Sequence, residues 1–133
     1  MSDNNETCGR KDPASFCEMR RIMGDFAPNT LKAIKDLTPG FVDIIRDLDD
    51  AILSEGALDM KTKRLIALAC VCVRACDDCV YAQAKVAKNY GATRAEILEA
   101  VQVAVLTGGV PSWSIAKKGI VQLFKEWDEE EGK

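Results

Sequence analysis

A nearly continuous apolar segment near the middle of the chain runs directly into a cluster of cysteines. Residues 65–73 are almost entirely apolar, and four of the six cysteines of the chain lie within residues 70–79. A segment that is apolar on every side is typical of a helix buried at the centre of a domain. Val71 and Val73 would also suit a strand, but helical spacing continues on both sides of them. We therefore expect a central helix capped by Asp59.

Helical periodicity also covers most of the remaining chain, because apolar residues recur three and four positions apart. Thr93 and Glu96 form the sequence signature of a capping box at the start of one such segment. Neither the alternation of a strand nor a hairpin dipeptide is present. The sequence therefore predicts an all-α fold of about seven helices, over residues 13–24, 28–37, 38–53, 59–73, 76–90, 93–106 and 111–127.

Length and composition limit the class of protein. A chain of 133 residues corresponds to one domain. We expect an N-terminal extension over residues 1–25, a helical domain over residues 26–127 and an acidic tail over residues 128–133. The net charge of −3 and the lack of a basic patch argue against a nucleic-acid partner. No apolar run reaches the roughly 20 residues of a membrane span, and the polar start shows no signal peptide, so we expect a cytoplasmic protein.

Cys76 and Cys79 form a C-x-x-C pair at the predicted start of a helix, and this pattern indicates redox chemistry. The positive end of a helix dipole favours a thiolate, which is the reactive form of cysteine. We expect Cys76 to lie in the first helical turn and to gain most from this effect. The neighbouring Asp77 and Asp78 act in the opposite direction, and Arg74 can offset them. The pair suits attack on a peroxide or on a disulfide.

Three other interpretations of the cysteines remain open. A zinc site would need thiolates from separate loops, and the chain contains no histidine. The spacing of Cys72, Cys76 and Cys79 matches an iron–sulfur motif, but that motif belongs to a loop of a larger α/β fold. Cys70 and Cys72 also fit an interpretation as small buried core residues. We expect no metal and no cofactor, and we expect the remaining cysteines, Cys8 and Cys17, to be an idle thiol and a packed side chain.

Several runs together resemble a known family. They are residues 61–69, the Cys76–Cys79 pair, and the segments 91–93 and 96–100. This combination, within residues 40–125, resembles the carboxymuconolactone decarboxylase family, especially its small members akin to alkylhydroperoxidase D. The resemblance implies an all-helical fold, assembly as a trimer or hexamer, and often a thiol-dependent peroxidase activity. It also implies that Cys79 forms the sulfenic acid and that Cys76 then closes the disulfide, whereas the helix dipole favours Cys76 as the more reactive thiol.

The chain departs from the family pattern at two positions. Arg64 and Gln83 stand where the family carries a glutamate and a histidine that relay protons to and from the thiols. Gln83 cannot titrate, and Arg64 cannot act as a base. Tyr81 is the other titratable group nearby. The candidate site residues are therefore Cys76, Cys79, Arg64, Gln83 and Tyr81.

We expect a thiol-dependent redox protein that acts on a peroxide or a disulfide and is reduced by an unidentified thiol donor. A non-catalytic redox-sensing or binding protein of the same fold is the alternative. A lactone decarboxylase is disfavoured because the chain lacks histidine. Several predicted helices are apolar on more than one face, which favours a homo-oligomer.

Overall fold

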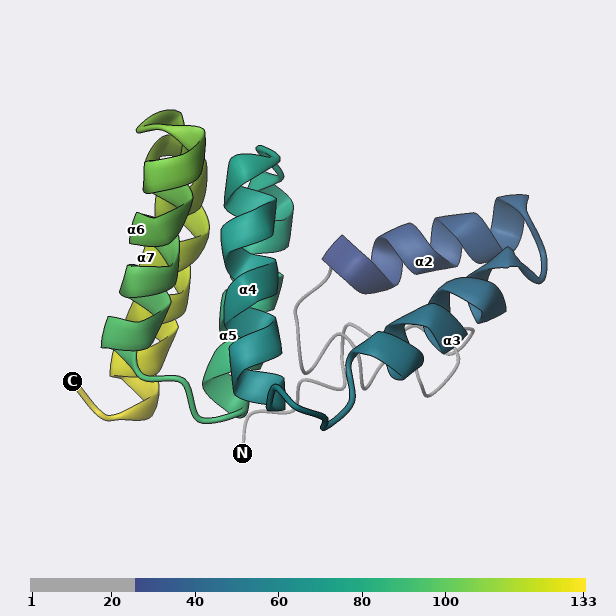
Figure 1. Cartoon of the computed structure of the whole chain (residues 1–133), viewed down its shortest axis with the longest axis horizontal. Helices are drawn as coiled ribbons and strands as arrows, with labels where there is room; N and C mark the ends of the chain where they lie inside the picture. Colours follow the sequence, from purple (N-terminus) through teal and green to yellow (C-terminus); the bar gives the residue numbers. More distant parts are fainter. Residues whose placement is uncertain (1–25) are drawn as a thin grey trace.

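The computed structural model describes residues 26–133, and this part of the chain is all-helical (Figure 1). The predicted helix over residues 13–24, together with Cys8 and Cys17, lies outside the described residues. Each of the other predicted helices is present. They are α2 (Phe26–Leu37), α3 (Phe41–Ile52), α4 (Met60–Val73), α5 (Asp77–Asn89), α6 (Arg94–Gly108) and α7 (Pro111–Glu130). The all-α prediction is therefore confirmed.

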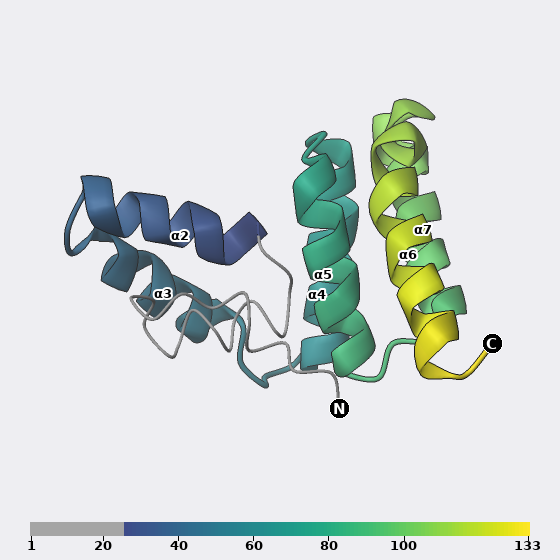
Figure 2. The ribbon, with the colours of Figure 1, turned by 180° about the vertical axis from the view of Figure 1, so that it is seen from behind.

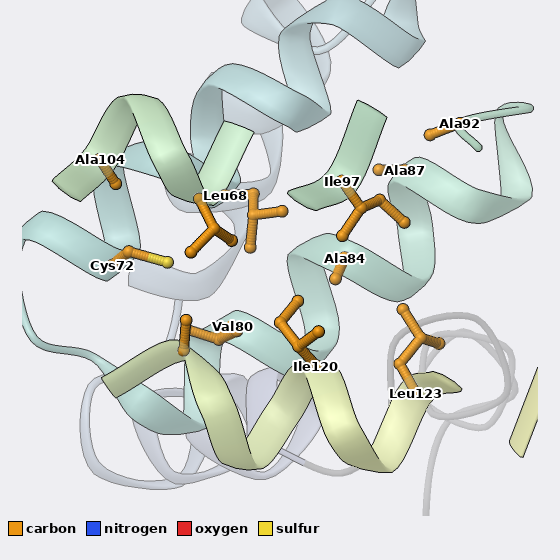
Figure 3. Close-up of a cluster of buried hydrophobic side chains, with 12 residues drawn as sticks. Leu68, Cys72, Val80, Ala84, Ala87, Ala92, Ile97, Ala104, Ile120 and Leu123 are labelled. Carbon is orange, nitrogen blue, oxygen red and sulfur yellow. The ribbon is translucent and has the colours of Figure 1, made fainter. Parts of the chain in front are cut away.

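Helices α4 to α7 form a bundle around one apolar core. Helix α4 packs against α5 and α6, and α7 packs against the same two helices. The core draws side chains from all four helices (Figure 3), among them Leu68, Cys72, Val80, Ile97, Ile120 and Leu123. Among the described residues, no helix is both long and apolar enough to cross a membrane.

Local sequence signals explain where the bundle helices begin and end. The side chain of Asp59 accepts a hydrogen bond of 2.7 Å from the backbone N–H of Thr62 at the start of α4. Thr93 and Glu96 form the predicted capping box at the start of α6. Gly109, with a φ of 82°, ends that helix in a backbone conformation that favours glycine. These caps confirm the expected boundaries to within a few residues.

Helices α2 and α3 form an arm that extends away from the bundle (Figures 1 and 2). A small separate cluster holds the two helices together, with Leu31 and Val42 at its centre. Among the described helices, α3 packs only on α2, and α2 packs on α5. The Lys63 ammonium of α4 fastens the end of α3, because it donates to the carbonyl oxygens of Ile52 (2.9 Å) and Ser54 (2.6 Å).

The apolar stripe of α3 is mostly exposed, at Phe41, Ile44, Leu48 and Ile52. Two expectations need correction. Helix α4 was expected to be buried on every side, but Ile66, Cys70 and Val73 are exposed. Helix α7 continues to Glu130, where a tail was expected after residue 127.

The extension of α7 has a physical cause. Arg94 on α6 forms an ion pair of 2.6 Å with Asp128, and its guanidinium lies over the ring of Trp127, 4.9 Å from the centroid. Both contacts hold the last turns of α7 against the bundle. Part of the acidic segment that was expected to be a tail is therefore helical and packs against α6 through Asp128.

Candidate active site

The turn between α4 and α5 sets the position of the C-x-x-C pair. Ala75 adopts a left-handed backbone conformation with a φ of 59°. The N–H of Ala75 donates to the carbonyl oxygen of Cys72 (3.2 Å), and the N–H of Cys76 donates to that of Val71 (3.0 Å). This is the pairing of a Schellman motif, in which glycine usually occupies the left-handed position. The tight turn places Cys76 at the N-cap of α5.

Cys76 and Cys79 are joined by a disulfide at the N-terminus of α5. Their Cα atoms lie 5.3 Å apart, and the N–H of Cys79 donates to the carbonyl oxygen of Cys76 at 3.1 Å. Both residues are half-buried. Cys76 occupies the N-cap, not the first helical turn, so both sulfurs lie at the positive end of the helix dipole. The dipole therefore does not distinguish the two thiols.

Arg64 on α4 and Gln83 on α5 contact each other. The Nη1 atom of Arg64 donates a hydrogen bond of 3.2 Å to Oε1 of Gln83. Gln83 follows Cys79 by four residues, so the two side chains lie on the same face of α5, about one turn apart. The structure thus pairs Cys76 with Cys79 and Arg64 with Gln83, and Gln83 lies on the Cys79 face of α5.

The guanidinium of Arg64 is half-buried, and few groups of the protein offset the cost of burying its charge. Its Nε atom is buried without a hydrogen-bond partner, and no carboxylate lies within 4 Å among the described residues. Burial lowers the pKa of Arg64, while the charges of Tyr90 and Asp49 partly oppose that effect. The side chain remains a cation at neutral pH, because the ordinary pKa of arginine is far above 7.

The acidic residues of the motif face solvent. Asp77 and Asp78 are exposed in the first turn of α5, where carboxylates interact favourably with the helix dipole. Arg74, which was expected to offset them, is exposed at the C-cap of α4 and forms no ion pair within 4 Å among the described residues. Of the two arginines considered, Arg64 is the one that contacts the Cys79 face of α5, through Gln83.

Tyr81 takes part in a different contact. Its hydroxyl donates a hydrogen bond of 2.5 Å to Glu126 on α7 and accepts one of 2.9 Å from Lys85. Two residues along a helix correspond to a rotation of about 200°, so Tyr81 faces away from Cys79. These contacts give Tyr81 a structural role between α5 and α7.

The other two described cysteines differ sharply. Cys72 is 1% exposed, and its sulfur points toward Leu68 in the core (Figure 3). Burial raises the pKa of the Cys72 thiol to about 11, which keeps it protonated and unreactive. Cys70 is an exposed free thiol, so the core interpretation holds for Cys72 alone. Among residues 26–133, no group of three or more histidine, cysteine, aspartate or glutamate side chains is arranged to hold a metal ion.

Two contributors to the site were not predicted. Ala75 carries no sequence cue for a left-handed conformation, since glycine is the usual residue there. Asp49 influences Arg64 from α3, a different element, and only the folded structure reveals this proximity.

Comparison with known proteins identifies relatives that match most of the described helices. Residues 39–118 match the model of the carboxymuconolactone decarboxylase family. An uncharacterised protein from Methanocaldococcus jannaschii is 35% identical over 94 residues, which span 70% of this chain and 90% of that protein. An uncharacterised protein encoded in the cox locus of Paracoccus denitrificans is 36% identical over 76 residues, or 57% of this chain and 68% of that protein.

Solved structures show the same architecture. A family member from Legionella pneumophila, solved in its apo form, superposes with a TM-score of 0.68 at 31% identity, covering 82% of this chain and 96% of that one. A family member from Thermotoga maritima, for which an involvement in antioxidative response has been suggested, superposes with a TM-score of 0.68 at 28% identity, covering 89% and 95%. The family model covers more than half of the chain and the helical fold agrees, so this chain belongs to the carboxymuconolactone decarboxylase family.

Proposed function

We propose that this protein is a thiol–disulfide oxidoreductase that cycles Cys76 and Cys79 between a disulfide and a dithiol. The observation that carries the proposal is the half-buried disulfide at the N-terminus of α5, with Arg64 bonded to Gln83 on the face of Cys79. A helix N-terminus and a nearby cation both favour a thiolate. The family relationship and the suggested antioxidative role of the Thermotoga maritima relative support the same class of chemistry.

The exchange reaction balances without a further reactant. In the reduced protein, one thiolate attacks a sulfur of a substrate disulfide, the substrate S–S bond breaks, and one substrate thiolate leaves. The second protein thiol loses its proton, attacks the mixed disulfide and releases the second substrate thiolate. The protein loses two electrons and the substrate gains them. A dithiol donor restores the starting state by the reverse sequence.

The pairing of Arg64 with Gln83 favours disulfide exchange over peroxide reduction. Cleavage of a peroxide O–O bond releases a strongly basic alkoxide or hydroxide, which needs a proton donor in the site. Neither Arg64 nor Gln83 can donate a proton at neutral pH. A departing thiolate is a far weaker base and leaves without protonation. Tyr81, the fifth candidate residue, donates its hydroxyl proton to a hydrogen bond with Glu126 instead.

Peroxide reduction is the second candidate, because the family resemblance implies it. In that reaction the Cys79 thiolate attacks one peroxide oxygen, the O–O bond breaks, and an alcohol or water leaves with a proton from solvent. Cys76 then attacks the sulfenic acid and releases water. The position of Gln83 and Arg64 on the face of Cys79 agrees with the family assignment of Cys79 as the attacking thiol.

The test compares both oxidants on the reduced protein. Hydrogen peroxide or a small disulfide is mixed with it, the remaining thiols are alkylated, and the modified cysteines are mapped by mass spectrometry over time. For each oxidant, the rate of Cys76–Cys79 disulfide formation is divided by the oxidation rate of a free thiol of equal pKa. We expect this ratio to be higher with the small disulfide than with the peroxide. Cys79→Ser abolishes turnover, and Cys70→Ser is the matched control that retains it. Full turnover by Cys79→Ser would refute the proposal.

We also propose that the protein is a homo-oligomer, in which a second copy covers the exposed apolar stripe of the arm. The stripe contains Phe41, Ile44, Leu48 and Ile52, each at least half exposed within one chain. Leu37, at the tip of the arm, is 82% exposed. Soluble monomers rarely expose so continuous an apolar surface. The trimer or hexamer implied by the family resemblance would cover it.

A further inference from the structure

The pair formed by Arg64 and Gln83 can offer hydrogen-bond donors to an incoming molecule. Nη1 of Arg64 donates to Oε1 of Gln83, which uses one of the two lone pairs of that oxygen. Neither Nη2 of Arg64 nor Nε2 of Gln83 makes a hydrogen bond to another described residue. Neither atom is completely buried, so each can still donate to a bound molecule. Both side chains therefore keep an available donor, and one of them is charged.

The charge of this pair is also uncompensated. Arg94, another half-buried cation of the bundle, has a carboxylate partner, Asp128, at 2.6 Å. Arg64 has only a neutral amide, and its Nε atom is buried without a partner. A partly desolvated guanidinium is best stabilised by a carboxylate that accepts two hydrogen bonds from it or its neighbours. Among the described residues, none supplies that carboxylate.

We propose that Arg64 Nη2 and Gln83 Nε2 bind a carboxylate of the substrate disulfide and so orient its S–S bond toward Cys79. This assignment rests on the proposed function, and it names the substrate class as small disulfides that carry a carboxylate near the sulfur. Gln83 lies about one helical turn from Cys79, a distance of roughly 6 Å along the helix. A carboxylate separated from its sulfur by two or three bonded atoms spans that distance.

Nearby acidic residues bear on the charge of the site. Asp49 on α3 is close enough to influence the pKa of Arg64, but it lies beyond 4 Å. Asp77 and Asp78 are exposed and extend into solvent at the end of α5. The net charge of the chain is −3, so the overall field repels anions. A preference for an anionic substrate would therefore have to come from a local contact.

The first measurement uses a probe that cannot react. The oxidised protein is titrated with pentanoate and, separately, with pentanamide at constant ionic strength, while NMR follows the Arg64 Nε–H and the Gln83 side-chain amide. We expect saturable shifts at both groups with pentanoate and none with pentanamide. Arg64→Gln abolishes the shift at Gln83, and Arg74→Gln, which removes an exposed cation next to the motif, retains it. Equal shifts with both probes, no shifts at all, or shifts that survive Arg64→Gln would overturn the proposal.

The second measurement separates this inference from the proposed function. The reduced protein is oxidised by 3,3′-dithiodipropionate or by its diamide, which accept the same two electrons and differ only in charge. We expect the acid to react at least about tenfold faster, as one bidentate charged contact predicts, and we expect Arg64→Gln to remove the preference. Equal rates at Cys76 and Cys79 would refute carboxylate recognition and leave the redox function standing. Failure of both reagents would refute the redox function, and the titration with pentanoate would still decide whether the anion site exists.

Discussion

The bundle and the arm are built from similar amphipathic helices but bury them to very different degrees. Leu68 of α4 is 0% exposed, whereas Leu48 of α3 is 57% exposed. The bundle closes around its own core, while α3 packs only on α2 among the described helices. The difference shows that a helical apolar stripe does not by itself say whether its own chain buries it. In the bundle the partner is the same chain, and for the arm we propose a second copy.

The largest expected effect is the loss of assembly when the stripe of the arm is charged. Leu48→Asp places a carboxylate in the proposed contact between copies, where it would be desolvated without a partner. We expect sedimentation velocity to show the variant at the monomer mass of 14.6 kDa and the native protein at a multiple of it.

Arg46→Gln is the matched control for that experiment. It lies on the same helix, is exposed, and changes the net charge by the same amount as Leu48→Asp. We expect this variant to remain assembled. A native protein that sediments as a monomer would mean that the arm is not covered by a second copy.

Truncating one leucine in each region tests the comparison directly. Leu68→Ala leaves a cavity in the closed core of the bundle, and we expect it to lower the free energy of unfolding by about 2–5 kcal/mol. This loss should not depend on protein concentration, because the cavity lies within one chain. Leu48→Ala should cost less than about 1 kcal/mol in dilute protein and more at high concentration, where association contributes to stability. Urea denaturation at two concentrations would measure both; equal, concentration-independent losses would contradict the distinction.

The sequence was sufficient to predict where the helices begin and end, because the capping signals are local. The cap at Asp59, the capping box at Thr93 and Glu96, and the stop at Gly109 each act within one turn, and all of them are present. The burial of each face was less predictable, because it depends on which elements meet. Cys70 and Cys72 lie in the same apolar segment, yet one is exposed and the other is buried.

The candidate site shows the same division between local and distant information. The position of the C-x-x-C pair at a helix start was predictable, and the family pattern pointed to Arg64 and Gln83. Their mutual hydrogen bond depends on the packing of α4 against α5. The contact of Tyr81 with Glu126, which removes that tyrosine from the site, joins residues far apart in the chain. Such pairings leave no trace in a single sequence.

Two glycines distinguish close packing in the bundle from backbone geometry in the arm. A Cβ at Gly119 would lie 2.8 Å from the backbone nitrogen of Tyr81, so α7 approaches α5 only because this residue has no side chain. Gly119→Ala should therefore cost about 1–3 kcal/mol by forcing the helices apart. Gly40 has a φ of 86° and open space around it, so Gly40→Ala should cost about 1 kcal/mol through backbone strain alone.

Thermal unfolding of both glycine variants provides the measurement. A larger side chain separates the two causes. Gly119→Val should lower the stability more than Gly119→Ala does, because the space at position 119 is already filled. At position 40 a second substitution should instead restore stability. Gly40→Asn should recover most of the lost stability, because asparagine tolerates a positive φ better than alanine. No recovery with Gly40→Asn, or no added loss with Gly119→Val, would contradict the assignment.

The smallest expected effect concerns the interior of the bundle at high pH. Burial raises the pKa of Cys72 from 9.0 to about 11. Below pH 9 the thiol is protonated in both the folded and the unfolded chain, so its contribution to stability is fully present. As the pH rises from 9 toward 11, the unfolded chain loses this proton while the folded chain retains it. The free energy of unfolding should then fall by at most about 1.4 kcal/mol per pH unit.

Cys72→Ala isolates this effect from the titration of other groups. The variant is less stable than the native protein at pH 8 because it leaves a small cavity beside Leu68, but it has no thiol to titrate. The gap in stability between the two proteins, both with the Cys76–Cys79 disulfide intact, should narrow between pH 9 and pH 11. A constant gap for Cys72→Ala would mean that the core of the bundle opens enough to ionise this thiol, and the contrast between a closed bundle and an open arm would weaken accordingly.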